Sequence, residues 1–279
     1  MKAWIGDGCS GRLVGPQDAQ VSIMDHGFTV GDGVFETVKV TSLGPFALTR
    51  HLDRLVASAA RVGAALPDIA HIREACEQVV SANLGEVGDL ARLRITWTSG
   101  AAPLGSDRAD APPTLVIAMM RQQPWPEATT AITIPWVRNP RSIIAGAKST
   151  SYGENVVALV RAHEAGASEA ILGTTDGRLC EGTGSNVFVV RDGEIATPTL
   201  DSGCLAGITR QLVLEWFGGV ECDLPLEALQ EADEVFITSS TRDVHPVIRV
   251  DDRRWSDAGP RAALLREEFI ARARTHLDP

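Results

Sequence analysis

Lysine is the scarcest charged residue of this 279-residue chain. Of its 26 basic side chains, 23 are arginine and only three are lysine, Lys2, Lys39 and Lys148. A codon bias toward arginine explains the scarcity, but it leaves the question of why these three positions kept an amine. An arginine can replace a surface charge, whereas its guanidinium does not deprotonate and cannot act as an amine nucleophile. Each lysine is therefore a candidate for amine chemistry.

Paired cysteines and long apolar runs are also missing. The five cysteines are odd in number and form no C-x-x-C pair, which argues against a disulfide framework and a zinc site. We therefore expect reduced thiols in a cytoplasmic protein. No run of 18 apolar residues occurs, and Gly6 and Gly8 break the N-terminus too early for a signal peptide, so we expect no membrane segment. The six histidines show no metal-ligand spacing, so no metal is expected.

The charge balance is acidic. The formal net charge of −10 argues against a nucleic acid or an anionic membrane as partner. Hydrophobic residues make up 44% and charged residues 22%, which is ordinary globular composition. The length fits one large domain or two modest ones.

Turn and periodicity signals outline a mixed α+β chain. Thr49 is the expected N-cap of a helix whose apolar face carries Leu52, Leu55 and Ala59, and Asp68 is the expected N-cap of a second helix. Further helices are expected at residues 154–165, from 208 to about 217, and from about 258. Strands are expected at residues 34–40, 90–98, 114–120, 131–137, 169–172, 186–190, 234–238 and 247–250.

The segment RQQPWP, which begins at Arg121, is the expected linker. Its two prolines disfavour regular structure and favour an extended connection. We therefore expect a small N-terminal α/β domain over residues 1–120, a linker over 121–127, and a larger domain over 128–279.

Lys148 lies in IIAGAKSTSY, where it is the only charged residue between Arg141 and Glu154. Small neighbours allow another group to approach closely, and a desolvated lysine favours the neutral amine. A neutral amine attacks an aldehyde to form a Schiff base. The alternative is a loop lysine whose stem crosses the surface to water.

Other segments offer complementary chemistry. In CEGTGSNVF, a carboxylate from Glu181 facing a pyridine nitrogen would keep that nitrogen protonated. GITR, residues 207–210, opens a helix whose backbone N–H groups suit a phosphate, and TSST, residues 238–241, adds hydroxyls. Each signal is common alone: Glu181 is equally a turn residue, and Arg54 a solvated helix charge. The glycines of 180–188 precede a strand, so they are no Rossmann fingerprint.

Together these segments resemble the class IV (fold-type IV) pyridoxal-phosphate (PLP)-dependent aminotransferases. This family includes D-amino-acid aminotransferases, branched-chain aminotransferases and 4-amino-4-deoxychorismate lyases. The matching stretches follow the family's order and cover nearly the whole chain. They are DHGFTVGDGVFETVKV (25–40), HLDRL (51–55), AGAKSTSY (145–152), CEGTGSNVF (180–188), CLAGITR (204–210) and ADEVFITSSTRDVHPV (232–247).

The resemblance implies a role for individual residues. Lys148 is expected to be catalytic and to hold PLP as a Schiff base. Glu181 is expected to contact the pyridine nitrogen, and Leu205 to pack on the ring. Arg54, Ile208, Thr209 and Ser240 are expected to bind the phosphate. The resemblance also implies a β-barrel-like core in the larger domain, a homodimer, and ping-pong transfer between an amino donor and a 2-oxo acid acceptor.

The substrate side is less determined. TSSTRDVHPV and VGDGVFETVKV favour D-amino-acid transamination, yet that group often carries an arginine and a histidine after the strand at 90–98, and this chain has PLGS there. Arg94 or Arg242 could hold the substrate carboxylate instead, or could be a structural ion-pair residue. Phe35, Thr37 and Thr241 are the other expected substrate contacts.

Three alternatives remain open. The lyase would use the same lysine to release pyruvate from aminodeoxychorismate and leave 4-aminobenzoate. An L-branched-chain aminotransferase ranks after it. A protein that holds PLP without turnover belongs to another class, and full cofactor occupancy without a spectral change on adding amines would support it.

Overall fold

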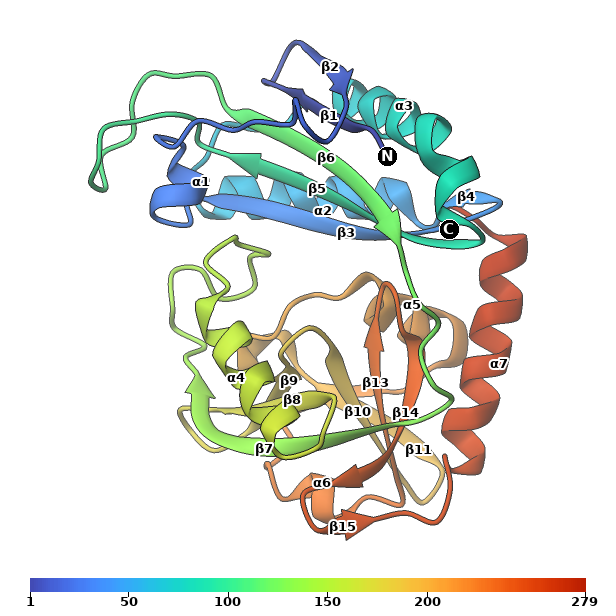
Figure 1. Ribbon diagram of the computed structural model, residues 1–279. Helices are drawn as coiled ribbons and strands as arrows, with labels where there is room; N and C mark the ends of the chain where they lie inside the picture. The colour runs from blue at the N-terminus through green and yellow to red at the C-terminus, as the bar shows by residue number, and fades with distance from the viewer. The chain divides into compact units, whose positions relative to one another are not determined.

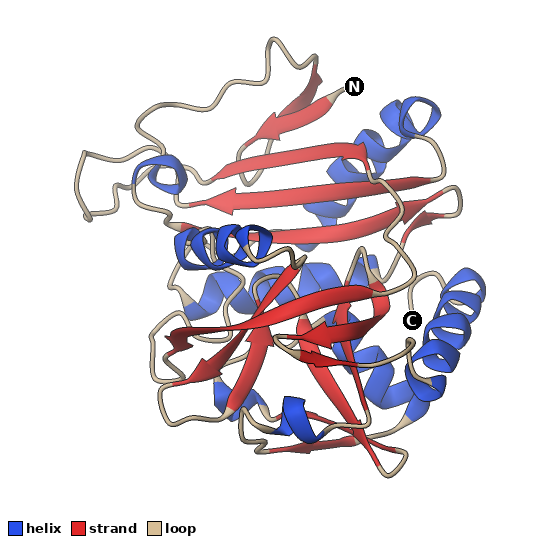
Figure 2. Ribbon diagram, turned by 60° about the horizontal axis from the view of Figure 1, so that its bottom comes forward, coloured by secondary structure: helices blue, strands red, loops and turns tan.

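The computed structural model describes residues 1–279, which divide into two compact units, each with its own sheet (Figure 1, Figure 2). Unit 1 comprises Met1–Pro124, Ala147–Tyr152 and His276–Pro279. Unit 2 comprises Trp125–Gly146 and Gly153–Thr275. Two short segments that the sequence assigns to the larger domain, one of which contains Lys148, therefore belong to unit 1.

Unit 1 is an antiparallel sheet in the order β2-β1-β6-β5-β3-β4, with helices α2 and α3 packed on one face (Figure 1). Its elements are β1 (Ala3–Gly6), β2 (Gly11–Val14), α1 (His26–Thr29), β3 (Gly33–Thr41), β4 (Gly44–Pro45), α2 (Leu48–Arg61), α3 (Ile69–Val87), β5 (Leu90–Thr98) and β6 (Thr114–Arg121).

The side chains of β3 alternate between a buried face, packed against α2 and α3, and a face that carries the expected substrate contacts. Val34, Val38 and Val40 are fully buried in one apolar cluster with residues of α2 and α3. Because successive strand residues point to opposite faces, Phe35 and Thr37 point away from these helices. The face of the sheet that carries no helix of unit 1 is therefore the one that presents the expected substrate contacts.

The helix boundaries of unit 1 test two sequence predictions. The Asp68 side chain accepts hydrogen bonds from the backbone N–H groups of Ala70 and His71, which confirms it as the N-cap of α3. Thr49 is not the N-cap of α2, because that helix begins at Leu48 after Ala47 in the left-handed region at φ 54°. The Thr49 N–H instead donates to Asp278 Oδ1 at 2.9 Å, a partner at the other end of the chain.

Unit 2 is built on strands that close into a ring. The sheet runs β12-β11-β10-β13-β14-β7-β8-β9, and β9 also pairs with β10 through Asn186 and Glu181, so that β10, β13, β14, β7, β8 and β9 form a closed barrel. This confirms the expected barrel-like core. The strands are β7 (Thr129–Arg138), β8 (Glu169–Thr174), β9 (Leu179–Gly182), β10 (Asn186–Arg191), β11 (Glu194–Pro198), β12 (Val220–Cys222), β13 (Glu234–Ser239), β14 (Asp243–Val250) and β15 (Arg253–Arg254).

Helices cover the outside of this barrel. Helix α4 contacts β7 and β8, α5 contacts β13, and α7 contacts β13 and β14 (Figure 1). Strand residues such as Val187, Val235 and Val247 form one buried apolar cluster. The helical elements are α4 (Gly153–Glu164), the 3₁₀ turn η1 (Leu200–Ser202), α5 (Ile208–Phe217), α6 (Ala228–Glu231) and α7 (Pro260–Thr275).

Strand β14 begins earlier than the sequence predicts, at Asp243 rather than at Val247. Pro246 made a strand over these residues less favourable, since proline donates no ladder hydrogen bond. In the structure Pro246 faces β13 and lies before the first β14–β7 pair, at Val247. The missing donor therefore lies where the second neighbour of β14 has not yet begun to pair.

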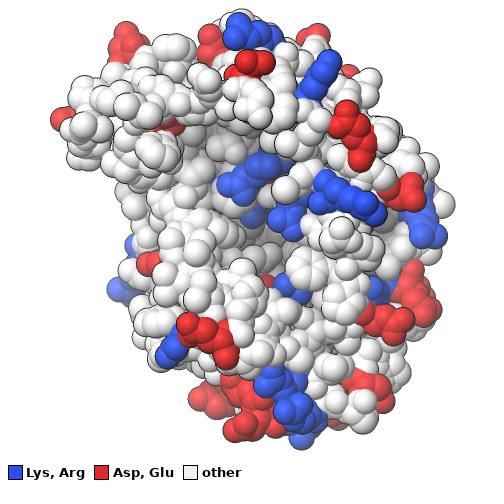
Figure 3. Space-filling model, in the orientation of Figure 1, with Lys and Arg blue, Asp and Glu red and all other residues white.

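None of the helices combines the length and the apolar character that crossing a bilayer requires. On the face shown in Figure 3, acidic and basic side chains lie in small separate groups among uncharged atoms.

Candidate functional site

In unit 1 the segment that carries Lys148 runs along β3. The Phe35 N–H donates to the Lys148 carbonyl at 2.9 Å, and the Thr150 N–H donates to the Gly33 carbonyl at 2.8 Å. These bonds place the Lys148 side chain over the Phe35 ring, with Nζ 4.5 Å from the ring centroid. Tyr152 meets the same ring edge-on, with the ring centroids 5.3 Å apart. The lysine is thus positioned by backbone pairing, and it lies on an aromatic wall.

Arg94 shares that wall. Its guanidinium carbon lies 3.3 Å from the Phe35 ring centroid, and its Nε donates to Thr96 Oγ1 at 3.3 Å. Its register partner on β3 is Thr37. Burial lowers the pKa of Arg94 to about 10, so the side chain remains a cation near neutral pH. The structure therefore brings four of the expected residues together: Phe35, Thr37, Arg94 and Lys148.

Arg54 lies on the helix-covered side of β3, where it is held by a buried carboxylate. Its Nε donates to Glu36 Oε1 at 2.8 Å, and its Nη2 donates to Glu36 Oε2 at 2.7 Å. His51, one helical turn earlier, contacts Glu36 Oε2 through Nδ1 at 2.7 Å. Glu36 is 0% exposed, and the side chain of Arg54 is 11% exposed. This two-bond fork fixes the plane of the guanidinium.

The protonation states of this cluster follow from its geometry. Burial alone raises the pKa of Glu36, but the charge of Arg54 and the bonds from Arg54 and His51 outweigh it and hold that pKa far below its ordinary value. Burial lowers the pKa of His51, against the attraction of Glu36. Near neutral pH the cluster is therefore an ion pair between Glu36 and Arg54 beside a neutral imidazole.

In unit 2 the carboxylate of Glu181 is held by two donors. The Leu205 N–H donates to Oε2 at 2.9 Å, and Arg138 Nη2 lies 3.3 Å from Oε1. The side chain of Glu181 is only 12% exposed. Glu181 and Leu205, both expected cofactor contacts, are therefore joined by a direct hydrogen bond.

The expected phosphate residues Ile208 and Thr209 occupy the first turn of α5, and both are buried. The helix begins after Gly207, where an added Cβ would lie 2.0 Å from Asn186 Oδ1. Only glycine fits this approach, while Asn186 Nδ2 donates to the Leu205 carbonyl at 2.8 Å. The first N–H groups of a helix have no intrahelical acceptor, so this turn is suited to an anion.

The turn between β13 and β14 carries the other hydroxyl and arginine candidates. Ser240 is half-buried and Thr241 is buried. The Arg242 guanidinium stacks on Trp125 at 3.8 Å, and its Nη2 donates to the Ser168 carbonyl at 3.1 Å. These contacts favour the structural alternative that the sequence left open for Arg242.

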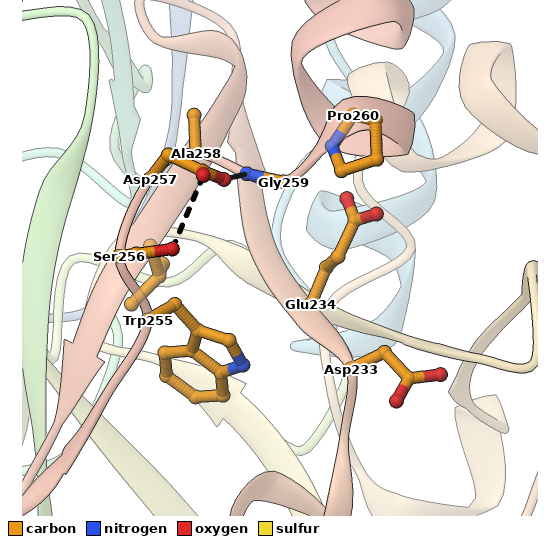
Figure 4. Close-up of a pocket in the computed structure, with 9 residues that line it drawn as sticks. Asp233, Glu234, Trp255, Ser256, Asp257, Ala258, Gly259 and Pro260 are labelled. Carbon is orange, nitrogen blue, oxygen red and sulfur yellow. Dashed lines mark hydrogen bonds between the residues drawn. The ribbon is translucent and has the colours of Figure 1, made fainter.

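A pocket of about 310 Å³ in unit 2 lies at the start of α7, and none of the residues expected at the site lines it. Figure 4 shows Glu234 pointing toward Pro260 at that helix end. Its carboxylate accepts from the backbone N–H groups of Arg261 and Ala262, at 3.1 and 2.7 Å. Glu234 therefore caps a helix, and no lysine, arginine or histidine lines this pocket.

Three residues that hold the candidate groups were missed at the sequence level. They are Glu36, His51 and Arg138. Glu36 had a usable signal, because it stands at a position of β3 whose neighbours on the same face are valines, and a buried charge needs a partner. Arg138 had none, because its role depends on the pairing of β7, β8 and β9.

Comparison with known proteins identifies the family of this chain. The family model described as "Amino-transferase class IV" matches residues 33–250. The chain is 36% identical over 273 residues to a "Putative branched-chain-amino-acid aminotransferase" of Methanocaldococcus jannaschii, covering 93% of each. It is 34% identical over 275 residues to a D-alanine aminotransferase of Listeria monocytogenes, again covering 93% of each.

The fold gives the same answer. A fold IV-transaminase from Curtobacterium pusillum superposes with a TM-score of 0.87 at 29% identity, covering 99% of both chains. The match of the family model spans most of the sequence, and the two relatives align over nearly their full lengths. The chain therefore belongs to the class IV aminotransferases, which are PLP-dependent enzymes with the fold of the fold-type IV transaminases.

Proposed function

We propose that this aminotransferase moves the amino group of a D-amino acid to a 2-oxo acid. The observation that carries the substrate part of the proposal is the shared Phe35 wall, on which Lys148 Nζ and the Arg94 guanidinium both lie. An arginine holds a carboxylate with two parallel hydrogen bonds. A substrate carboxylate on Arg94 would therefore present its α-carbon near the amine of Lys148.

The residues present suit PLP by the chemistry of their donor sets. Lys148 offers the amine, and Glu181 offers a carboxylate already oriented by Leu205 and Arg138. Arg54, with the first turn of α5 at Ile208 and Thr209 and the hydroxyl of Ser240, would bind the phosphate. Leu205 would pack on the ring. When bound, the cofactor supplies an aldehyde that condenses with amines and a ring that accepts an electron pair.

The protein's own residues then have separate tasks. Lys148 Nζ removes the proton from the substrate Cα and delivers it again, first as general base and then as general acid. Arg94 fixes the substrate carboxylate, while Phe35, Thr37 and Thr241 line the side-chain pocket. The donor leaves as a 2-oxo acid before the acceptor binds, so the kinetics are ping-pong.

The D-amino-acid assignment is supported by the Listeria relative and by the stretch TSSTRDVHPV. An L-branched-chain substrate is the second candidate, because the Methanocaldococcus relative, at slightly higher identity, is named a putative branched-chain-amino-acid aminotransferase. The test is to mix purified holoenzyme with D-alanine and 2-oxoglutarate and to follow pyruvate and glutamate, with L-leucine and L-valine as parallel donors. Turnover with the L-donors alone would refute the D-assignment.

A third arm of the same experiment addresses the lyase reaction. Aminodeoxychorismate is supplied without any 2-oxo acid, and 4-aminobenzoate is measured. A transaminase requires the acceptor, so formation of 4-aminobenzoate together with no amino transfer from D-alanine would overturn the proposal.

We also propose that the enzyme works as a homodimer. Helix α4 buries Asn155 and Ala158, whereas Val156, Val157 and Val160 remain 51–57% exposed on another face. A contiguous apolar helix face in water favours a protein partner. Sedimentation should give twice the chain mass, and Val157→Glu should shift it to the monomer, while Val220→Glu on β12 should not. A wild-type monomer would refute the dimer.

All five cysteines are unpaired thiols, which supports a reducing, cytoplasmic location, and cell fractionation tests it.

A further inference from the structure

The Glu181 carboxylate is divided between two different donors. Oε2 accepts from the Leu205 backbone N–H at 2.9 Å, and Oε1 faces Arg138 Nη2 at 3.3 Å. The two side chains are 12% and 17% exposed, so water screens their attraction only partly. The backbone donor sets the direction of the carboxylate, and the arginine adds a positive side chain within ion-pair distance of it.

Arg138 is itself held in place. Both of its terminal nitrogens lie 3.4 Å from Asn155 Oδ1, and the buried Asn155 donates its amide to the Thr183 carbonyl. A longer contact of 3.5 Å joins Arg138 to Glu154, whose side chain is 81% exposed. Arg138 Nε is buried and has no hydrogen-bond partner. The side chain thus leaves one donor unsatisfied while its terminal nitrogens meet Asn155 and Glu181.

This placement determines which form of Glu181 is favoured. Burial favours the neutral acid, and an adjacent positive charge favours the carboxylate. A carboxylate accepts a hydrogen bond from a protonated ring nitrogen, whereas a neutral acid would donate to an unprotonated one. The positive charge at position 138 therefore favours the arrangement in which the ring nitrogen donates the hydrogen bond to Glu181.

We propose that Arg138 is a positioning residue that keeps Glu181 ionised and aimed, and thereby keeps the pyridine nitrogen of the bound cofactor protonated. This rests on the proposed role of Glu181 at that nitrogen. The arginine does not touch the substrate. It acts through Glu181 on the electron-accepting strength of the ring, and so on proton removal by Lys148.

The experiment loads the enzyme with PLP labelled with ¹⁵N in the ring and records the nitrogen chemical shift between pH 6 and 9. Wild type should show the protonated shift throughout. Arg138→Met should show the unprotonated shift over part of this range, with kcat lowered by about 10- to 100-fold, the scale for groups that orient a ligand. Arg138→Lys, which keeps the charge with a shorter reach, should lose the proton at a pH between the two.

Two further variants make the outcome decisive. Glu154→Gln removes the exposed partner of Arg138 and should match wild type. Glu181→Gln should give the unprotonated shift, and if it does not, the role of Glu181 in the proposed function fails first. If Glu181→Gln loses the proton while Arg138→Met and Arg138→Lys keep it throughout, the inference about Arg138 is wrong. Unfolding temperatures identify any variant that fails to fold, and Arg138→Lys then decides alone.

Discussion

The buried pair of Glu36 and Arg54 offers the sharpest test of how unit 1 supports its chemistry. In Glu36→Gln the size of the side chain is kept, but an amide NH₂ group would face the guanidinium donors of Arg54. Breaking one partner of a buried ion pair costs about 3–5 kcal/mol, because the other charge stays buried without compensation. The low exposure of both side chains, 0% and 11%, places this pair in that class rather than among surface pairs.

The expected loss can be measured as a melting temperature. A chain of this size loses about 2–4 °C for each kcal/mol, so Glu36→Gln should melt roughly 6–20 °C below wild type. Asp53→Asn is the matched control, because Asp53 is an exposed carboxylate on the same helix as Arg54. It should melt within about 2 °C of wild type, as most surface substitutions stay within ±0.5 kcal/mol.

The pH dependence has a definite sign. The pKa of Glu36 is depressed in the folded protein, so its contribution is present above the unfolded pKa, near 4.5, and is lost as the pH falls toward the folded value. The difference between wild type and Glu36→Gln should therefore be constant from pH 7 to about pH 5 and narrow below about pH 4.5. Urea unfolding at several pH values measures it. A variant that melts with the Asp53→Asn control, or a gap that widens in acid, would refute the reasoning.

Three further changes probe the site and the thiols. Lys148→Ala should lower kcat by about 10³-fold or more and should abolish the covalent, borohydride-reducible link to PLP seen by mass spectrometry; an active variant that keeps the link would contradict the role of this amine. Arg94→Gln should lower kcat/KM for the amino acid by about 10- to 100-fold through the loss of a charged carboxylate contact, while the PLP dissociation constant stays the same. At pH 8, iodoacetamide should modify exposed Cys9 first and leave Cys76 and Cys180 unmodified until the protein unfolds. Burial raises the pKa of Cys76 to about 12 and also raises the pKa of Cys180. Peptide mapping measures the order of labelling, and early labelling of either buried thiol would contradict this prediction.

The sequence revealed the groups that carry chemistry more readily than the contacts that hold them. Lys148 stood out because lysine is rare and because its neighbours are small and uncharged. The strand at Leu90–Thr98 was predicted with its observed bounds, since its alternation of buried and half-buried residues is a local property. The barrel core followed from the family resemblance rather than from any local pattern.

Contacts between distant segments were beyond local patterns. The start of α2 depends on Asp278, which no periodicity connects with Thr49. The barrel closes through a pairing of Asn186 with Glu181, which depends on the register of β9 and β10. Register is set by the burial of whole strands and by turn geometry, so a motif search along one strand does not reveal its neighbour.

In each unit a residue expected to bind the cofactor is held by a residue of opposite charge, and the two charges are exchanged between the units. In unit 1 the residue expected to bind the cofactor phosphate is Arg54, and the buried carboxylate of Glu36 holds it in place. In unit 2 the residue expected to contact the pyridine nitrogen is Glu181, and its carboxylate forms an ion pair with Arg138. A residue that binds the cofactor can be recognised from its motif, because its chemistry must match the cofactor. A residue that only holds it in place needs the opposite charge at the right position in the fold, which no motif reveals. Replacing Arg138 by lysine, which keeps the charge, should therefore preserve part of its effect. Replacing Lys148 by arginine should not preserve activity, because that position requires an amine that can lose its proton.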